Sequence, residues 1–191
     1  MEDIEIEIQV KIGKPEALLE FLDKNGKLKY KDHQVDEYFT PAHRDFKAVR
    51  PVKEWLRLRD SSGKFSITYK NWYFDDQGRS NHCCDEYETP VEDITQIKNI
   101  FSALNFKSLA IVDKIRQAWD YKDYEVAMDS VKGLGDFVEI EYKGKETVDP
   151  NTTAEEMIQF LKDIGCGKIA INHVGYPFQI MFPEEVKFEE K

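Results

Sequence analysis

The feature that most constrains the fold is a strict alternation of aliphatic side chains with charged or polar ones. It is clearest over residues 4–12, IEIEIQVKI, where isoleucine and valine take every second place and Glu5, Glu7, Gln9 and Lys11 take the others. Successive side chains of a β-strand point to opposite faces of the sheet. The segment is therefore predicted to be a strand with one apolar and one charged face.

The same period of two recurs along the chain and predicts an antiparallel sheet. We expect further strands at 55–60, 65–72, 82–89, 109–121, 124–131 and 137–142. Short turn sequences at 61–64 and 122–123 separate neighbouring strands, which is typical of hairpins.

Three segments carry apolar residues at helical spacing instead. The first begins at Pro15 and ends at Asn25, the second follows residues 89–92, and the third ends before Gly165. Residues 89–92, TPVE, have the spacing of a capping box with proline at the first helical position, so they are predicted to start the second helix. Thr153 is the predicted N-cap of the third helix.

Composition indicates one ordinary globular domain. The 191 residues include 41% hydrophobic and 13% aromatic side chains, and we expect a single domain over 1–191. No apolar run reaches the roughly 20 residues that a membrane-spanning helix needs. The acidic start of the sequence and an odd number of cysteines, three, favour a cytoplasmic location without disulfides. A net charge of −10 argues against nucleic acid as a partner.

Alternation alone does not decide where the charged face points. For a single half-buried strand, solvent is the ordinary answer. Three amphipathic helices, however, need an apolar surface to cover, and the aliphatic face of the sheet is such a surface. About eight antiparallel strands are enough to close a barrel. We therefore predict an α+β fold, in which a closed or nearly closed eight-stranded antiparallel β-barrel forms a tunnel with a charged interior and helices packed outside.

The predicted interior carries both acids and bases. The acids expected there are Glu5, Glu7, Glu86, Glu88, Asp129, Glu139 and Glu141. The bases expected there are Lys11, Arg57, Arg59, Lys70, Lys114 and Arg116. Burying that many charges costs several kcal/mol per ion unless each has a counterpart. Phosphate oxygens suit the bases, and Mg²⁺ or Mn²⁺ suits the carboxylates, so we predict a tunnel that binds a phosphate chain with metal.

A series of short motifs then occurs in a fixed order. They are EIEIQ at 5–9, RDF at 44–46, LRLR at 56–59, TYK at 68–70, EYE at 86–88, KIR at 114–116, AMD at 127–129 and GLGDFVEIE at 133–141. In number and order these motifs resemble the CYTH superfamily and, within it, the class IV adenylyl cyclase branch. The resemblance implies an eight-stranded antiparallel tunnel that binds triphosphates with a divalent metal ion.

The resemblance also implies roles for individual residues. Phosphate would be bound by Arg57, Arg59, Lys70, Lys114 and Arg116, of which Lys70, Lys114 and Arg116 would act in catalysis. Metal would be bound by Glu5, Glu7, Asp129, Glu139 and Glu141. The cavity wall would be completed by Gln9, Glu86 and Glu88.

Two parts of the chain leave alternatives open. The family opens with Glu-x-Glu-x-Lys, and Gln9 replaces the lysine, which removes a positive charge. Lys11 is a candidate replacement in phosphate binding, because it lies on the same strand face about 7 Å further along. Near the end of the sequence, Tyr176, Phe178 and Phe182 either close a mouth of the tunnel or pack on the third helix, and we expect packing.

Three functions fit these expectations. The first is a cyclase that converts ATP to cyclic AMP and pyrophosphate, and it is slightly favoured by the motifs. The second is an inorganic or organic triphosphatase, and the third is a protein that binds nucleotides or polyphosphate without turnover. Each takes a triphosphate-containing small molecule with Mg²⁺ or Mn²⁺, and the resemblance is compatible with a homodimer.

Overall fold

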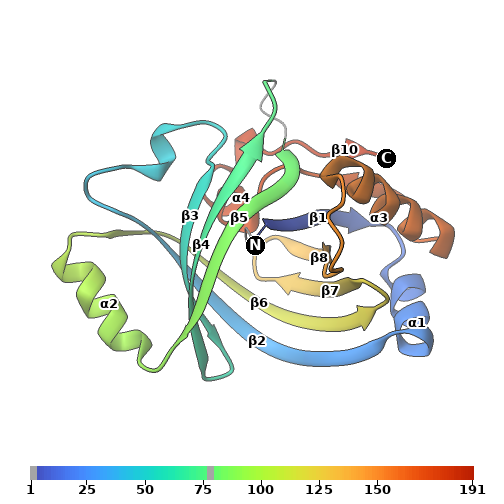
Figure 1. Cartoon of the computed structure of the whole chain (residues 1–191), viewed down its shortest axis with the longest axis horizontal. Helices are drawn as coiled ribbons and strands as arrows, with labels where there is room; N and C mark the ends of the chain where they lie inside the picture. Colours follow the sequence, from blue (N-terminus) through green and yellow to red (C-terminus); the bar gives the residue numbers. More distant parts are fainter. Residues whose placement is uncertain (1–3, 77–79) are drawn as a thin grey trace.

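A computed structural model describes residues 4–76 and 80–191. In these ranges eight antiparallel strands close into a barrel in the order β1-β5-β4-β3-β2-β6-β7-β8, with β8 pairing back to β1 (Figure 1). The barrel strands are β1 (Ile4–Ile12), β2 (Lys27–Thr40), β3 (Glu54–Ser61), β4 (Lys64–Phe74), β5 (Ser80–Val91), β6 (Lys107–Tyr121), β7 (Tyr124–Val131) and β8 (Gly135–Tyr142). The predicted fold class is confirmed.

Helices and two short strands surround the barrel. The helices are α1 (Pro15–Asn25), α2 (Ile94–Ala103), α3 (Pro150–Ile164) and α4 (Tyr176–Met181), with short 3-10 turns at Phe46–Ala48 and Pro183–Glu185. The strands β9 (Ile169–Ile171) and β10 (Glu189–Glu190) extend the sheet beside β1. None of the helices in the described ranges has the length and apolar character needed to span a lipid bilayer.

The main core lies between the barrel wall and the helices α1 and α3. Ile8 and Val10 of β1 pack there with Leu18 of α1 and with Met157 and Leu161 of α3, and all five side chains are buried. Burying an aliphatic side chain of this size contributes roughly 1.5–3 kcal/mol. Because this packing takes the aliphatic face of β1 outward, it turns the opposite face, with its glutamates, into the barrel.

A smaller core supports the other end of the barrel, where α2 lies apart from α1 and α3 (Figure 1). Phe101 of α2 packs edge-on against Phe39 of β2, with 5.1 Å between ring centroids, and both rings contact a cluster that includes Leu58 of β3. The expectation that helices cover the apolar face of the sheet therefore holds at both ends.

Strand β2 is a barrel strand that the sequence pattern did not predict. It runs for 14 residues between β3 and β6 and pairs with both. Its first residues are exposed, and its buried positions include the polar Gln34 and Asp36. Because neither face of the strand is consistently apolar, hydrophobic alternation gives no signal for it.

Two predicted helix starts were wrong. Residues 89–91 belong to β5, and α2 begins later, where the Asp93 carboxylate accepts a hydrogen bond of 3.0 Å from the Gln96 N–H. In α3 the N-cap is Asp149, whose carboxylate accepts from the Thr152 N–H at 2.8 Å, while Thr153 is buried inside the helix. In both cases an aspartate that can accept from the first-turn amides takes the capping place.

Candidate functional site

The barrel encloses a cavity of about 290 Å³ that is lined by side chains from all eight of its strands. Among the predicted site residues, twelve line this cavity: Glu5, Glu7, Gln9, Arg57, Arg59, Lys70, Glu86, Glu88, Lys114, Arg116, Glu139 and Glu141. The charged faces of separate strands thus converge on one space, as the inside-out barrel requires.

Lys11 lies outside that lining. Its ammonium group donates a hydrogen bond of 3.1 Å to the Leu134 carbonyl and lies 4.6 Å from the centre of the Phe137 ring. Strand β1 leaves β8 after Val10 and pairs with β9 from there on, so Lys11 sits beyond the end of the cavity. In this structure it therefore does not reach the part of the cavity that Gln9 lines.

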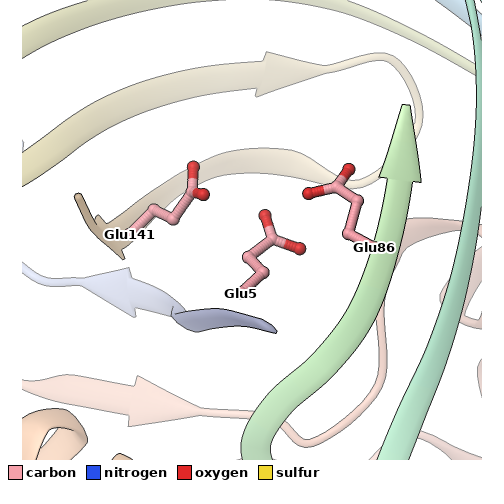
Figure 2. A group of neighbouring side chains, drawn as sticks. All are labelled: Glu5, Glu86 and Glu141. Carbon is pink, nitrogen blue, oxygen red and sulfur yellow. The ribbon is translucent and has the colours of Figure 1, made fainter. Parts of the chain in front are cut away.

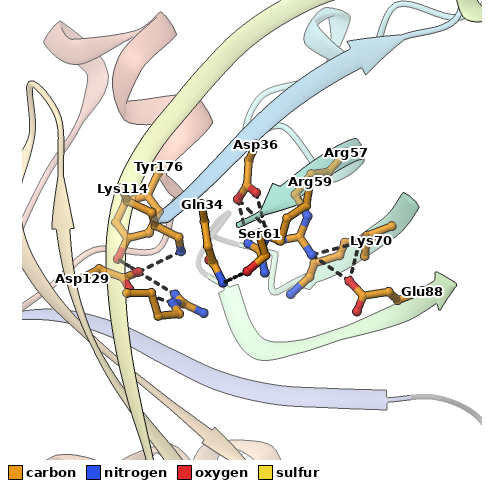
Figure 3. Close-up of polar contacts among 12 residues, drawn as sticks. Gln34, Asp36, Arg57, Arg59, Ser61, Lys70, Glu88, Lys114, Asp129 and Tyr176 are labelled. Atoms are coloured by element: carbon orange, nitrogen blue, oxygen red, sulfur yellow. Dashed lines mark hydrogen bonds and ion pairs between the residues drawn. The ribbon is translucent and has the colours of Figure 1, made fainter. Parts of the chain in front are cut away.

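One group of cations is built on β2 and β3. The buried Asp36 accepts two hydrogen bonds from Arg59, at 2.6 and 2.7 Å, and its second oxygen lies 3.8 Å from Arg57 Nη1 (Figure 3). Burial opposes the ionisation of Asp36, but the two guanidinium groups outweigh burial and lower its pKa. Arg57 also donates to the Thr68 hydroxyl at 2.9 Å and to Glu88 at 3.0 Å. We call Asp36, Arg57 and Arg59 the first cradle.

A second group is built on β6 and β7. Asp129 is 2% exposed and accepts hydrogen bonds from Arg116 on both oxygens, from Lys114 at 2.9 Å and from the Tyr176 hydroxyl at 2.9 Å (Figure 3). Burial, followed by the neighbouring charge of Arg116, lowers the pKa of Lys114 to about 8. We call Asp129, Lys114 and Arg116 the second cradle.

Two expectations change at the second cradle. Asp129 was predicted to be a metal ligand, but its oxygens are occupied by cationic donors and by Tyr176, and it is not among the cavity-lining residues. It is paired with the two bases of the cradle. Tyr176 was expected to pack on α3. It lines the cavity, and its ring packs edge-on against Phe137 of β8, with 5.0 Å between centroids.

The carboxylates gather elsewhere in the cavity. Glu5 of β1, Glu86 of β5 and Glu141 of β8 point toward one another, and one oxygen from each lies within 4.8 Å of the others (Figure 2). Lys70 forms ion pairs with Glu5 and, at 3.7 Å, with Glu86. Burial raises the pKa of Glu86, and burial followed by the charge of Glu5 raises the pKa of Glu141 to about 7. Of these three carboxylates, which we call the carboxylate trio, Glu86 and Glu141 therefore give up their protons less readily than ordinary glutamates.

Two further glutamates lie between the trio and the second cradle. Glu139 forms an ion pair with Arg116 and accepts a hydrogen bond of 2.9 Å from the Gln9 amide. Burial opposes its ionisation, but Arg116 and Lys114 lower its pKa. The carboxylate of Glu7 lies 3.6 Å from Lys70, and burial followed by the charge of Glu5 raises its pKa.

Several cavity residues were not predicted from the sequence. They are Tyr30, Asp36, Tyr38, Trp55, Thr68, Trp72, Glu125, Ala127, Lys143, Gly175, Tyr176 and Pro177. Asp36 and Tyr38 were missed with the strand that carries them. Thr68 and Trp55 could have been found, because they share the inward face of their strands with Lys70 and Arg57, two residues away.

Comparison with known proteins places this geometry in context. The CYTH domain family model matches residues 3–170. The "Putative adenylate cyclase MJ0240" of Methanocaldococcus jannaschii is 36% identical over 174 residues, which is 91% of this chain and 96% of that protein.

Solved structures have the same fold. PH1819 from Pyrococcus horikoshii gives a TM-score of 0.73 at 25% identity and covers 95% of this chain and 98% of its own. The Hippeastrum protein HpAC1, described as a putative adenylyl cyclase with a dominant triphosphatase activity, gives a TM-score of 0.62 at 20% identity, with 94% and 95% covered.

Proposed function

Because the chain belongs to the CYTH family, we propose that it binds a triphosphate with a divalent metal ion inside the tunnel and breaks one phosphoanhydride bond. The observation that carries this proposal is the composition of a single cavity. The bases of the two cradles, each held by a buried aspartate, share it with the carboxylate trio. A phosphate chain that is partly complexed by metal is complementary to both groups.

The carboxylate trio fits a small, hard cation. Mg²⁺ and Mn²⁺ favour carboxylate oxygens, and opposite ligands of Mg²⁺ lie about 4 Å apart, close to the 4.8 Å spread of Glu5, Glu86 and Glu141. When bound, such an ion would polarise phosphoryl oxygens and lower the pKa of a coordinated water. These three side chains would hold it.

The chain's own bases would do the rest of the binding. Arg57, Arg59 and Arg116 present planar donors to phosphate oxygens, and their positions are fixed by ion pairs with Asp36 and Asp129. Such fixed donors also stabilise the negative charge that develops on a departing phosphate group, without having to reorganise during the reaction. Lys114 would add a further positive charge in the range where it is protonated.

The first candidate reaction is cyclisation of ATP. It would release pyrophosphate, after the ribose 3′-hydroxyl attacks the α-phosphorus. The name of the M. jannaschii relative supports this candidate, since the two sequences are 36% identical over nearly their full lengths.

The second candidate reaction is hydrolysis of the terminal phosphate. It is favoured by the walls of the cavity, to which every barrel strand contributes at least one charged side chain. An adjoining aromatic cavity between Trp55, Trp72 and Phe178 has a volume of only about 40 Å³, room for a few water molecules. A site that binds the phosphate chain and leaves the organic part outside suits a triphosphatase.

One experiment separates the reactions. Purified protein is incubated with ATP, inorganic tripolyphosphate or thiamine triphosphate, each with Mg²⁺ or Mn²⁺, and the products are identified. Cyclic AMP with pyrophosphate supports the cyclase, orthophosphate supports the triphosphatase, and binding without any product would contradict turnover. Glu86→Gln should lower turnover by about 100-fold or more if the trio holds metal. Glu155→Gln on the exposed face of α3 is the matched control and should change nothing.

A further inference from the structure

The last part of the chain contributes to the tunnel although it lies beyond the matched family region. The family model ends at residue 170, whereas Asn172, Tyr176 and Gln179 follow it and are each 4% exposed. Tyr176 completes the second cradle. The other two side chains are amides, and both contact Gln9.

Gln9 is held by hydrogen bonds at both ends of its amide. Its oxygen accepts from Gln179 Nε2 at 2.8 Å and from Asn172 Nδ2 at 3.4 Å, and its nitrogen donates to Glu139 at 2.9 Å. In the described part of the chain, the Gln9 nitrogen has no second acceptor. Since Gln9 lines the charged cavity, its remaining N–H is available to a molecule bound there.

The backbone of Val174 fixes the orientation of both partner amides. The Val174 N–H donates to Asn172 Oδ1 at 3.0 Å, and the Val174 carbonyl accepts from Gln179 Nε2 at 3.3 Å. Rotating either amide by half a turn would set oxygen against oxygen or N–H against N–H. Both side chains therefore present donors to position 9, and only a side chain with an acceptor satisfies them.

We propose that residues 172–179 make position 9 specific for glutamine, and that Gln9 donates its free amide hydrogen to the bound phosphate chain. Gln179 is then a positioning residue that acts through Gln9. A lysine at position 9 could pair with Glu139, but it has three donors and no acceptor, so it would face two amide donors without a partner for either. The contact with phosphate rests on the proposed function, while the matching of positions 9 and 179 does not.

A double-mutant cycle on thermal stability tests the matching without any ligand. Gln9→Lys and Gln179→Glu should each lower the midpoint of unfolding, the first by opposing donor to donor and the second by opposing carboxylate to carbonyl. The double variant should unfold at a higher temperature than the sum of the single effects predicts, because an ammonium group then meets a carboxylate. If the two decreases in unfolding temperature simply add in the double variant, positions 9 and 179 are not matched and this part of the proposal is wrong.

A binding measurement tests the role toward phosphate. Calorimetric titration with tripolyphosphate and Mg²⁺ should show roughly tenfold weaker binding for Gln179→Ala, the loss of about one hydrogen bond. Gln159→Ala, on the exposed side of α3, is the matched control and should bind like the wild type. Unchanged affinity in Gln179→Ala would overturn the positioning role. Wild-type protein that binds no tripolyphosphate would overturn the proposed function and the phosphate contact of Gln9, whereas the stability cycle would still decide the matching.

Discussion

The first and second cradles, one in each half of the chain, hold their buried bases in the same way. In each, a buried aspartate lies directly opposite the second of two bases on the neighbouring strand, Asp36 opposite Arg59 and Asp129 opposite Arg116. The aspartates are 1% and 2% exposed, so each is a fixed counter-charge behind the bases. The common register explains how a closed barrel keeps several cations in its interior.

The cradles differ in what completes them. The bases of the first are two guanidinium groups, while the second combines the guanidinium group of Arg116 with a lysine whose pKa is about 8 and a tyrosine supplied by α4. Permanent charge in one cradle and titratable charge in the other imply that pH and the segment 172–179 act mainly on the second. Substitutions in the two cradles should therefore differ in their effects on stability and on binding.

Removing the central base of the second cradle should have the largest effect. Arg116→Ala leaves the buried Asp129 and the partly buried Glu139 without their main partner, which should cost about 3–5 kcal/mol in the free energy of unfolding. Arg57→Ala should cost less, because Arg59 still pairs with Asp36. Urea unfolding measures both, with exposed Arg44→Ala as a control expected to change stability by less than about 1 kcal/mol. A larger loss for Arg57→Ala would reverse the ranking.

Neutralising Asp36, the counter-charge of the first cradle, should have the second-largest effect. Asp36→Asn keeps the shape of the side chain but weakens its bonds to Arg59 and removes the charge beside Arg57, at a cost of roughly 1.5–3 kcal/mol in stability. Because the guanidinium groups are then less firmly placed, tripolyphosphate should bind about tenfold more weakly. Titration calorimetry checks the affinity, and a variant that binds as well as the wild type would show that Asp36 does not position the arginines.

The second cradle should give binding its pH dependence. The pKa of Lys114 is lowered from 10.5 to about 8, so the free protein loses this positive charge as pH rises through about 8. Triphosphate binds better when Lys114 is charged, so the affinity for triphosphate should fall between pH 7 and 9. The fall should be at most roughly tenfold for each unit of pH. Lys114→Arg keeps its charge throughout and should flatten the profile. An identical profile in that variant would assign the titration to another group.

Glu88, a partly exposed partner of the first cradle, should have the smallest effect on stability. Glu88 pairs with Arg57, but its side chain is 46% exposed, so Glu88→Gln should change the free energy of unfolding by no more than about 1 kcal/mol. Thermal unfolding checks this value. A loss as large as that of Asp36→Asn would show that the first cradle depends on both acids.

Much of the tunnel could be predicted from the sequence because its strands have one aliphatic face. That pattern located Glu5, Glu7, Arg57 and Arg59 on inward faces. Strand β2 lacks such a face, so Asp36 could not be found. Hydrophobic periodicity reports burial against a core, and a strand whose inner face meets a charged cavity and whose outer face is covered only near its end lacks that signal.

The contacts of long-range partners were also beyond the sequence. Asp129 was recognised as an inward acid, but only the structure shows that Lys114, Arg116 and Tyr176 occupy its oxygens. Similarly, alternation placed Gln9 correctly on the inner face of β1, whereas its partner Gln179 is 170 residues away. Pairings of this kind depend on how the chain closes, which local patterns do not specify.

The most direct test is a crystal structure with Mn²⁺ and tripolyphosphate, in which anomalous scattering locates the metal. We expect a manganese peak among Glu5, Glu86 and Glu141, and phosphate oxygens within hydrogen-bond distance of Arg57, Arg59 and Arg116. Manganese bound away from these carboxylates, or phosphate bound only on the outer surface of the barrel, would contradict the account.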